Sequence, residues 1–452
     1  MLRAWAGSAE AKGANPWDGR GSDMGPRLSV EQFSDADWFP SGIAQAIDPA
    51  AEQAPLGFEA WRLHTIHDSY LMVWPSGDLD EISWWQRMLP VGGGGKRWGE
   101  APDLTSATVE KSEGWGGPTY DIREGSGRRL VAKILPLDEC GHGRTLAELS
   151  SELLDSATGG IQWKGRDLVL FFRSESGKTA AELAATKFTA GDFAGAMAIC
   201  NKSGGLLGRF HQIALVRRSL PNDQRRWNGR LKELEQRVVS NTLWRAPHSS
   251  DTRATITHRN FGLENVRIDE QGDYHLAGCF DGVPNAILPR TCDFPVLRDV
   301  AAGYCSIARL TESQELSHAD EQRLRKAFFE GWREEAPPRA RSSKALDSHK
   351  GGVPIWEYEQ VLEEAAFALA WGKEVPPRTG WWLDHVSRIQ TSMYASRTLS
   401  AGSLACALGA LFTPFATQWV AALSDRIALT LALAGASLLL RWLYRQRAPP
   451  PY

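Results

Sequence analysis

The stretch THRNFGLENVRIDEQGDYHLAGCFDG, residues 257–282, carries most of the polar groups that a phosphoryl-transfer site needs. His258 and Asn260 open it, Asn265 follows after a short loop, and Asp281 closes it behind two short strand-like runs around DEQGD. Amide and carboxylate oxygens are suited to holding Mg²⁺ against a nucleotide phosphate. The stretch therefore predicts a phosphotransfer pocket. An asparagine, however, stands where a carboxylate would be needed to accept a proton.

A glycine-rich turn lies upstream of this stretch. EGWGGP carries Gly114, Gly116 and Gly117 between two strand-like runs, ATVEKS and TYDIRE. Flexible backbone at this point predicts a loop that covers nucleotide phosphates. A plain hairpin turn is the alternative, because glycine supplies positive φ in any tight turn.

Lys133 follows one strand later, inside the apolar run LVAKI. A lysine within an apolar strand is costly unless its amine reaches a partner. Phosphate oxygens would serve, as would a carboxylate from Glu148 or Glu152 on the predicted helix GRTLAELSSELLDSA. The alternative is an outward-facing lysine on an edge strand.

In this order the parts resemble the aminoglycoside phosphotransferase and choline kinase branch of the protein-kinase-like superfamily. HRNFGLEN is similar to the catalytic loop of that superfamily, and DLVLFFRSESGKTAAEL to its hinge strand and following helix. LLGRFHQI is similar to the end of its long helix. CDFPVLRDVA is similar to the segment in which Asp299 would brace the catalytic loop. Gly262 stands where protein kinases usually have lysine, which favours the small-molecule branch.

The resemblance covers about residues 105–335 and implies an α+β protein with a two-lobed protein-kinase-like fold. It implies an N-lobe at 105–176 and a C-lobe at 177–335, with ATP and Mg²⁺ between them. By resemblance, the metal ligands would be Asn265 and Asp281, and the catalytic positions His258 and Asn260. The alternative is that Asn265 caps a turn and Asp281 is an ordinary hairpin acid.

Asn260 replaces the aspartate of the family pattern. An amide takes up no proton near neutral pH, and losing a general base costs on the order of 10²–10⁴ in rate. Binding through Lys133, Asn265 and Asp281 does not depend on that group. The favoured hypothesis is therefore a pseudokinase that binds ATP-Mg. The alternatives are an active phosphotransferase that moves the ATP γ-phosphate to a small-molecule hydroxyl, and an interaction scaffold that binds no nucleotide.

The remaining N-terminal sequence predicts a disordered leader at 1–27 and a small tryptophan-rich domain at 28–100. VGGGGKRWGEAPD, residues 91–103, is typical of a flexible linker between this domain and the N-lobe. The net charge of −3 and the absence of a basic patch exclude an electrostatic argument for nucleic acid. The cysteines lack CxxC spacing, which argues against zinc and a disulfide framework.

The C-terminal part predicts a linker and an amphipathic helix within 336–397, the helix being EYEQVLEEAAFALAWGKE at 357–374. A membrane hairpin is expected at 398–444, because residues 398–424 are uncharged over a length that crosses a bilayer. Arginines flank both spans, which predicts two spans, a turn at 424–426 and soluble domains on the cytoplasmic side. Two buried core helices, or one span with an interfacial helix, are the alternatives. The expected partners are a nucleotide, the membrane and an unidentified protein or small molecule.

Overall fold

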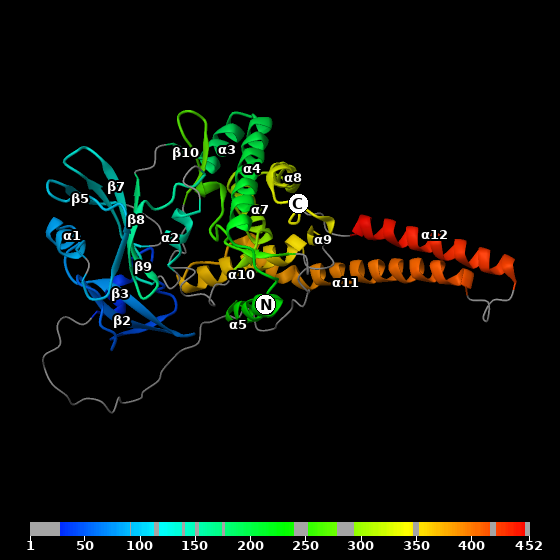
Figure 1. Ribbon diagram of the computed structural model, residues 1–452, viewed down its shortest axis with the longest axis horizontal. Coiled ribbons are helices and arrows are strands. Elements are labelled where there is room, and N and C mark those ends of the chain that lie inside the picture. Colours follow the sequence, from blue (N-terminus) through cyan, green and yellow to red (C-terminus); the bar gives the residue numbers. More distant parts are fainter. Residues whose placement is uncertain are drawn as a thin grey trace, which may run out of the picture.

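The computed structural model describes residues 28–90, 92–112, 117–137, 141–149, 153–173, 177–238, 252–277, 293–346, 352–415 and 422–447. The chain extends along one axis, with β-sheets at one end, a helical body in the middle and two long helices at the other end (Figure 1). The prediction of an α+β protein with two apolar C-terminal helices is confirmed.

The largest sheet has six antiparallel strands in the order β4-β8-β9-β7-β6-β5. Their bounds are β4 (Lys96–Gly99), β5 (Thr108–Ser112), β6 (Thr119–Arg123), β7 (Arg129–Ile134), β8 (Gly159–Trp163) and β9 (Arg166–Arg173). Lys133 pairs with Thr119 on one side and with Leu170 on the other, so these three side chains share one face. That face is covered in part by α2 (His142–Ala147), where Gly143 packs against Leu170.

The opposite face of this sheet is covered by the region that precedes it. Trp84 and Trp85 of α1 (Ile82–Met88) are fully buried in one cluster with Tyr120 and Ile122 of β6. A second sheet, β1-β2-β3, joins this region through a hydrogen bond from Val73 N to Pro136 O. Its strands are β1 (Ala44–Pro49), β2 (Phe58–Thr65) and β3 (Ser69–Pro75), preceded by the 3₁₀ helix η1 (Val30–Phe33).

A separate N-terminal domain at 28–100 is therefore not confirmed, because α1 and the sheet bury their side chains in a shared core. The prediction of a flexible linker is wrong for 96–99, which form strand β4 and pair with β8. Glycine content suggested a linker there, whereas pairing with a strand more than fifty residues away decides the structure.

The helical body contains α3 (Ala180–Thr189), α4 (Phe193–Arg217), α5 (Gln224–Val238), α7 (Leu297–Ser313), α8 (His318–Glu335), α9 (Ser343–Leu346) and α10 (Gly352–Ala370). Short strands connect them: β10 (Lys178–Thr179), β11 (Ala254–Thr255), β12 (Val266–Ile268), β13 (Tyr274–Leu276) and β14 (Phe294–Pro295). Helices α4 and α8 approach closely because each offers a glycine. A Cβ on Gly204 would lie 2.0 Å from Phe328 O, and one on Gly331 would lie 2.0 Å from Asn201 O.

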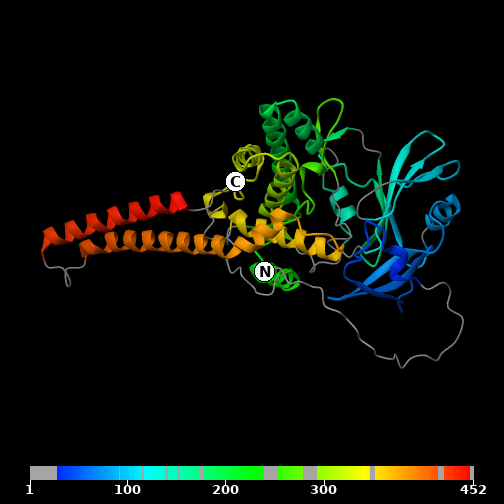
Figure 2. The same cartoon turned by 180° about the vertical axis from the view of Figure 1, so that it is seen from behind.

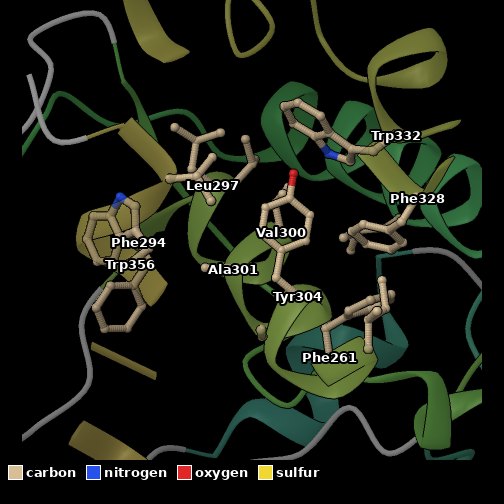
Figure 3. Close-up of a cluster of buried hydrophobic side chains, with 14 of the residues drawn as sticks. Phe261, Phe294, Leu297, Val300, Ala301, Tyr304, Phe328, Trp332 and Trp356 are labelled. Atoms are coloured by element: carbon tan, nitrogen blue, oxygen red, sulfur yellow. The ribbon is translucent and has the colours of Figure 1, made fainter. Parts of the chain in front are cut away.

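Helix α7 lies at the centre of the body's hydrophobic core. Figure 3 shows Phe294 and Trp356 on one side of it, and Phe261, Phe328 and Trp332 on the other. This packing fixes the first turn of α7, which faces the loop between β11 and β12.

The helix predicted at 357–374 is confirmed as far as Ala370, where α10 ends, but its amphipathic character is wrong, because α10 is buried around most of its circumference. Its glutamates are paired inside the core: Glu359 accepts from Arg230 Nε at 2.8 Å and from Arg298 Nε at 3.0 Å. Glu363 binds the same two arginines. Buried charges are tolerated when they are paired in this way.

Two long helices leave the body and run antiparallel at the far end of the molecule (Figure 2). They are α11 (Pro377–Phe412), followed by the 3₁₀ turn η4 (Thr413–Phe415), and α12 (Leu423–Arg447). Ser403 Oγ donates to Ser437 O at 3.0 Å, and Ser437 Oγ donates to Ser403 O at 2.9 Å. These two hydrogen bonds join the helices within their apolar parts, a few residues from the flanking Arg397 and Arg441.

The exposure of these helices contradicts the alternative of two buried core helices. In their most apolar 18-residue windows only 11% and 6% of the residues are buried, and Leu438 is 73% exposed. The turn predicted at 424–426 is also wrong, since these residues form the first turn of α12. An acidic side chain in the first turn stabilises a helix, so Asp425 and Arg426 mark the start of α12 and not the turn before it. The connection lies between Phe415 and Leu423.

Candidate functional site

The loop that follows β11 is bound to the first turn of α7 through Asp299. Asp299 Oδ2 accepts a hydrogen bond from His258 N at 2.7 Å, and Oδ1 accepts one from Arg259 N at 3.2 Å. Arg259 has a φ of +66°, a conformation that non-glycine residues adopt only when their surroundings impose it. Asp299 therefore braces the loop, as the sequence predicted.

The brace is completed by a buried histidine that sequence reasoning did not assign. His211 Nε2 lies 3.1 Å from Asp299 Oδ2, and Trp332 Nε1 donates to His211 Nδ1 at 3.0 Å. Because a tryptophan N–H can only donate, Nδ1 must accept and the proton of His211 is on Nε2. Burial alone would raise the pKa of Asp299, but hydrogen bonds from His211 and His258 N hold that pKa below its ordinary value.

His258 points into the same interior. Its ring is fully buried and packs edge-on against Phe210 and Phe261. Burial lowers the pKa of His258 to about 4, although the nearby Asp299 carboxylate favours the protonated form. His258 is therefore neutral at physiological pH and packs beneath the loop.

Asn265 ends the 3₁₀ helix η2 (Leu263–Asn265) and is held by the loop's own backbone. Its side-chain Nδ2 donates to the main-chain oxygen of Asn260 at 2.7 Å, and its own main-chain oxygen accepts from Ala277 N at 2.8 Å. A carbonyl only accepts, so the amide nitrogen must face residue 260 and Oδ1 must face away. That orientation leaves Oδ1 available as an oxygen ligand.

Glu264 is turned away from Asn260 and bound to α7. Its Oε2 accepts from Ser306 Oγ at 2.5 Å, and its Oε1 pairs with Arg309 Nη2 at 2.6 Å. Ser306 and Arg309 lie three residues apart on one helix face, a spacing that the sequence displays but that names no partner. Gly262 permits this arrangement, since a Cβ there would lie 2.5 Å from the Glu264 carboxylate.

Asn260 itself is partly exposed. The two carboxylates closest to it along the described loop and its brace, Glu264 and Asp299, are both engaged in the contacts above. Neither is placed to accept a proton in the position of the missing aspartate.

Lys133 is buried, with 8% of its surface exposed. It lies opposite Thr119, the first residue of β6, so Gly117, two residues before Thr119, is at the same end of the sheet. Gly117 is buried there, and a Cβ on it would lie 1.9 Å from Ile134 O. Close strand approach therefore requires this glycine, whatever else the turn does.

Glu148 lies at the surface of the molecule. The predicted helix at 143–157 is shorter than expected, because α2 ends at Ala147, and Glu148 caps it with 65% of its side chain exposed. Glu148 pairs with Arg144 at 2.8 Å. Glu152, Gly114, Gly116 and Asp281 lie outside the described residues.

The residues present fit a nucleotide with Mg²⁺ in one respect that the structure displays, the outward Oδ1 of Asn265. Within the described residues no group of three or more His, Cys, Asp or Glu side chains forms a metal cluster. Magnesium in phosphotransferases needs only one or two protein ligands beside phosphate oxygens and water, so a donor set of one amide and one carboxylate is chemically sufficient.

No protein-family model matches the sequence, and no curated protein matches it. Among solved structures, the chain is similar to a glucosamine kinase in complex with glucosamine, ADP and inorganic phosphate. The identity is 13% and the TM-score 0.46, over 81% of this chain and 98% of that chain. An amicoumacin kinase in complex with AMP-PNP and Ca²⁺ is similar at 13% identity and a TM-score of 0.40, over 63% of this chain and 88% of that one. Likeness at these identities and TM-scores carries no argument about activity.

Proposed function

We propose that this chain is a membrane-anchored, kinase-like protein that binds ATP with Mg²⁺ and is impaired in phosphoryl transfer. In this proposal Lys133 pairs with phosphate oxygens, while Asn265 Oδ1 and the Asp281 carboxylate hold the metal. Bound Mg²⁺ would neutralise phosphate charge. The exposed, apolar helices α11 and α12 form the membrane anchor, with the soluble part on the cytoplasmic side.

The observation that carries the proposal is the hydrogen bond from Asn265 Nδ2 to the main-chain carbonyl of Asn260. It supports a loop that keeps its metal-facing amide in position, while the side chain at 260 has no carboxylate. Asp299 supports the same conclusion, because it accepts hydrogen bonds from two backbone amides of the loop. A loop without any use for nucleotide has no need for this bracing together with a buried lysine.

The loss of chemistry follows from the amide at 260. With Glu264 bound to Arg309 and Asp299 bound to His211, the acceptor hydroxyl has neither of these carboxylates as a base. General-base loss costs on the order of 10²–10⁴ in rate. A loose transition state depends mainly on positioning, so slow residual transfer is compatible with the proposal.

The first test is nucleotide binding by the full chain in phosphatidylcholine nanodiscs. Millimolar ATP with Mg²⁺ should raise the melting temperature of wild type, because a ligand that binds only the folded state stabilises it. Asp281→Ala should lose most of that shift, whereas Glu233→Ala, which removes an exposed carboxylate from α5, should keep it. No shift in wild type would end the nucleotide-binding proposal and favour the scaffold alternative.

The second test is turnover. Asn260→Asp should raise ATP-dependent phosphate transfer or hydrolysis by about 10²–10⁴-fold over wild type. Asn228→Asp is the matched control, since it makes the same change at an exposed position of α5. Wild-type turnover that equals Asn260→Asp and disappears in Asp281→Ala would instead establish a working phosphotransferase.

A further inference from the structure

A cavity of about 480 Å³ lies in the helical body, beside the start of α7, the helix whose Asp299 binds the loop after β11. Its wall is formed by the C-terminal end of α4, the residues leading into β11, the start of α7 and the segment 337–340 that follows α8. This volume lies within the range of about 300–1,000 Å³ that is usual for small-molecule pockets.

The lining is mostly apolar, and its charged residues are arginines. Leu215, Val216, Leu297 and Pro337 are among the apolar residues of the wall. Among the described residues that line it, the charged side chains are Arg253 and Arg339, and none is an acid. Such a pocket is complementary to a molecule with an apolar chain and a negatively charged head.

Arg253, one of the two arginines of the pocket, is already oriented by hydrogen bonds. Arg253 Nε donates to Ser219 Oγ at 2.5 Å, and Arg253 Nη2 donates to Ser219 O at 3.0 Å. A guanidinium carries five N–H donors, so these two bonds fix its plane and leave others for a carboxylate or phosphate. Arg339 also lines the pocket, is exposed, and adds a second positive charge.

The pocket is distinct from the candidate nucleotide site. Val296 and Leu297 line the pocket, while Asp299, in the same turn of α7, binds the loop amides of His258 and Arg259. The start of α7 therefore separates the two sites, and neither Lys133 nor Asn265 lines the cavity.

We propose that this pocket binds an anionic amphiphile, with its acyl chain along the apolar wall and its carboxylate or phosphate at Arg253 and Arg339. Val216 stands at the mouth, 83% exposed, where an aliphatic side chain gains by covering a bound chain. A free fatty acid and an acidic membrane lipid both carry an anionic head of this kind, a carboxylate in the first and a phosphate in the second.

The experiment uses the full chain in phosphatidylcholine nanodiscs and a diazirine-bearing palmitic acid, followed by peptide mapping. Irradiation should label the peptides that contain residues 212–219 and 337–340, in addition to the background on α11 and α12. The corresponding uncharged alcohol should label the pocket peptides about ten-fold less, because it cannot form charge-assisted hydrogen bonds with Arg253 and Arg339. A second arm places the diazirine in the acyl chain of phosphatidylglycerol and omits free acid. If only one of the two arms labels the pocket peptides, that arm identifies the ligand as a free fatty acid or as a membrane lipid.

Two sets of variants sharpen the result. The double variant Arg253→Gln, Arg339→Gln should lose about ten-fold of the pocket labelling, and Arg225→Gln on α5 should lose none. Val216→Asp places a carboxylate at the exposed mouth and should repel the probe, whereas Val216→Asn, of similar size and no charge, should not. Because residue 216 is exposed, neither of these two substitutions disturbs the core.

Labelling confined to α11 and α12, equal labelling by acid and alcohol, or equal labelling of Val216→Asp and Val216→Asn would each overturn the proposal. ATP with Mg²⁺ should leave pocket labelling unchanged, and competition would assign the probe to the nucleotide site instead.

Discussion

The loop brace at Asp299 and the serine pair of the C-terminal hairpin both join distant segments through polar contacts. At Asp299 a buried carboxylate accepts hydrogen bonds from two backbone N–H groups and from His211. At the hairpin, Ser403 and Ser437 exchange hydrogen bonds between hydroxyls and carbonyls. The carbonyls involved already belong to α-helices.

The difference lies in what remains when the contact is broken. Without Asp299, two buried amides and a buried imidazole N–H lose their acceptor, and unsatisfied buried groups are costly. Without its partner, a helical serine can turn its hydroxyl to the carbonyl four residues earlier in its own helix. The brace should therefore be worth several times more than the serine pair, and four measurements test that ranking.

The largest effect is expected for Asp299→Ala. It should lower the free energy of unfolding by about 3–5 kcal/mol, because it leaves a buried polar network without its charged acceptor. Denaturant unfolding of the full chain measures this change. Glu233→Ala, an exposed carboxylate on α5, is the control and should change stability little. A loss under about 1 kcal/mol would show that the loop is held by packing alone.

The next effect is a pH dependence at the brace. The pKa of His258 is lowered from 6.5 to about 4 in the folded chain, so the unfolded chain binds more protons between these values. Stability is then fully present above pH 6.5 and falls as the pH decreases towards 4, by a total on the order of 3 kcal/mol. His258→Leu should flatten the curve of unfolding free energy against pH in that window. An unchanged slope would contradict the assignment.

Trp332→Phe removes one N–H from the outer end of the brace. His211 Nδ1 would lose its donor inside the core, and we expect a loss of about 1–3 kcal/mol. Trp371→Phe is the matched control: its indole donates to Asp37 O at a less buried position, where water can replace it. Equal losses in the two variants would show that ring packing dominates.

The smallest effect is expected for Ser403→Ala combined with Ser437→Ala. Hydrogen bonds between membrane helices contribute about 0.6 kcal/mol on average. Steric-trap unfolding of the full chain in bilayers would measure the difference. A loss as large as that of Asp299→Ala would overturn the ranking of the two contacts.

The sequence predicted the candidate loop well because its signals are local. The two short strands after the loop and the bracing role of Asp299 agree with the structure, and so does the strand containing Lys133. Each of these depends on residue types at short separations or on a strong periodic pattern.

The failures share a physical cause, which is a partner distant in sequence. Strand β4 forms because β8 pairs with it, and α10 is buried because arginines from α5 and α7 neutralise its glutamates. His211 could be recognised in the brace only after Asp299 and Trp332 were brought to it. Local patterns cannot display such partners.

The hydrogen bond between Asn265 and residue 260 has a consequence for how this loop can change over time. It uses the main-chain oxygen of residue 260, which all twenty amino acids possess. Exchanging the side chain at 260 therefore leaves the grip on Asn265 untouched. In the proposed function, nucleotide binding and turnover therefore depend on different groups of this loop, and a single codon can alter turnover while binding persists.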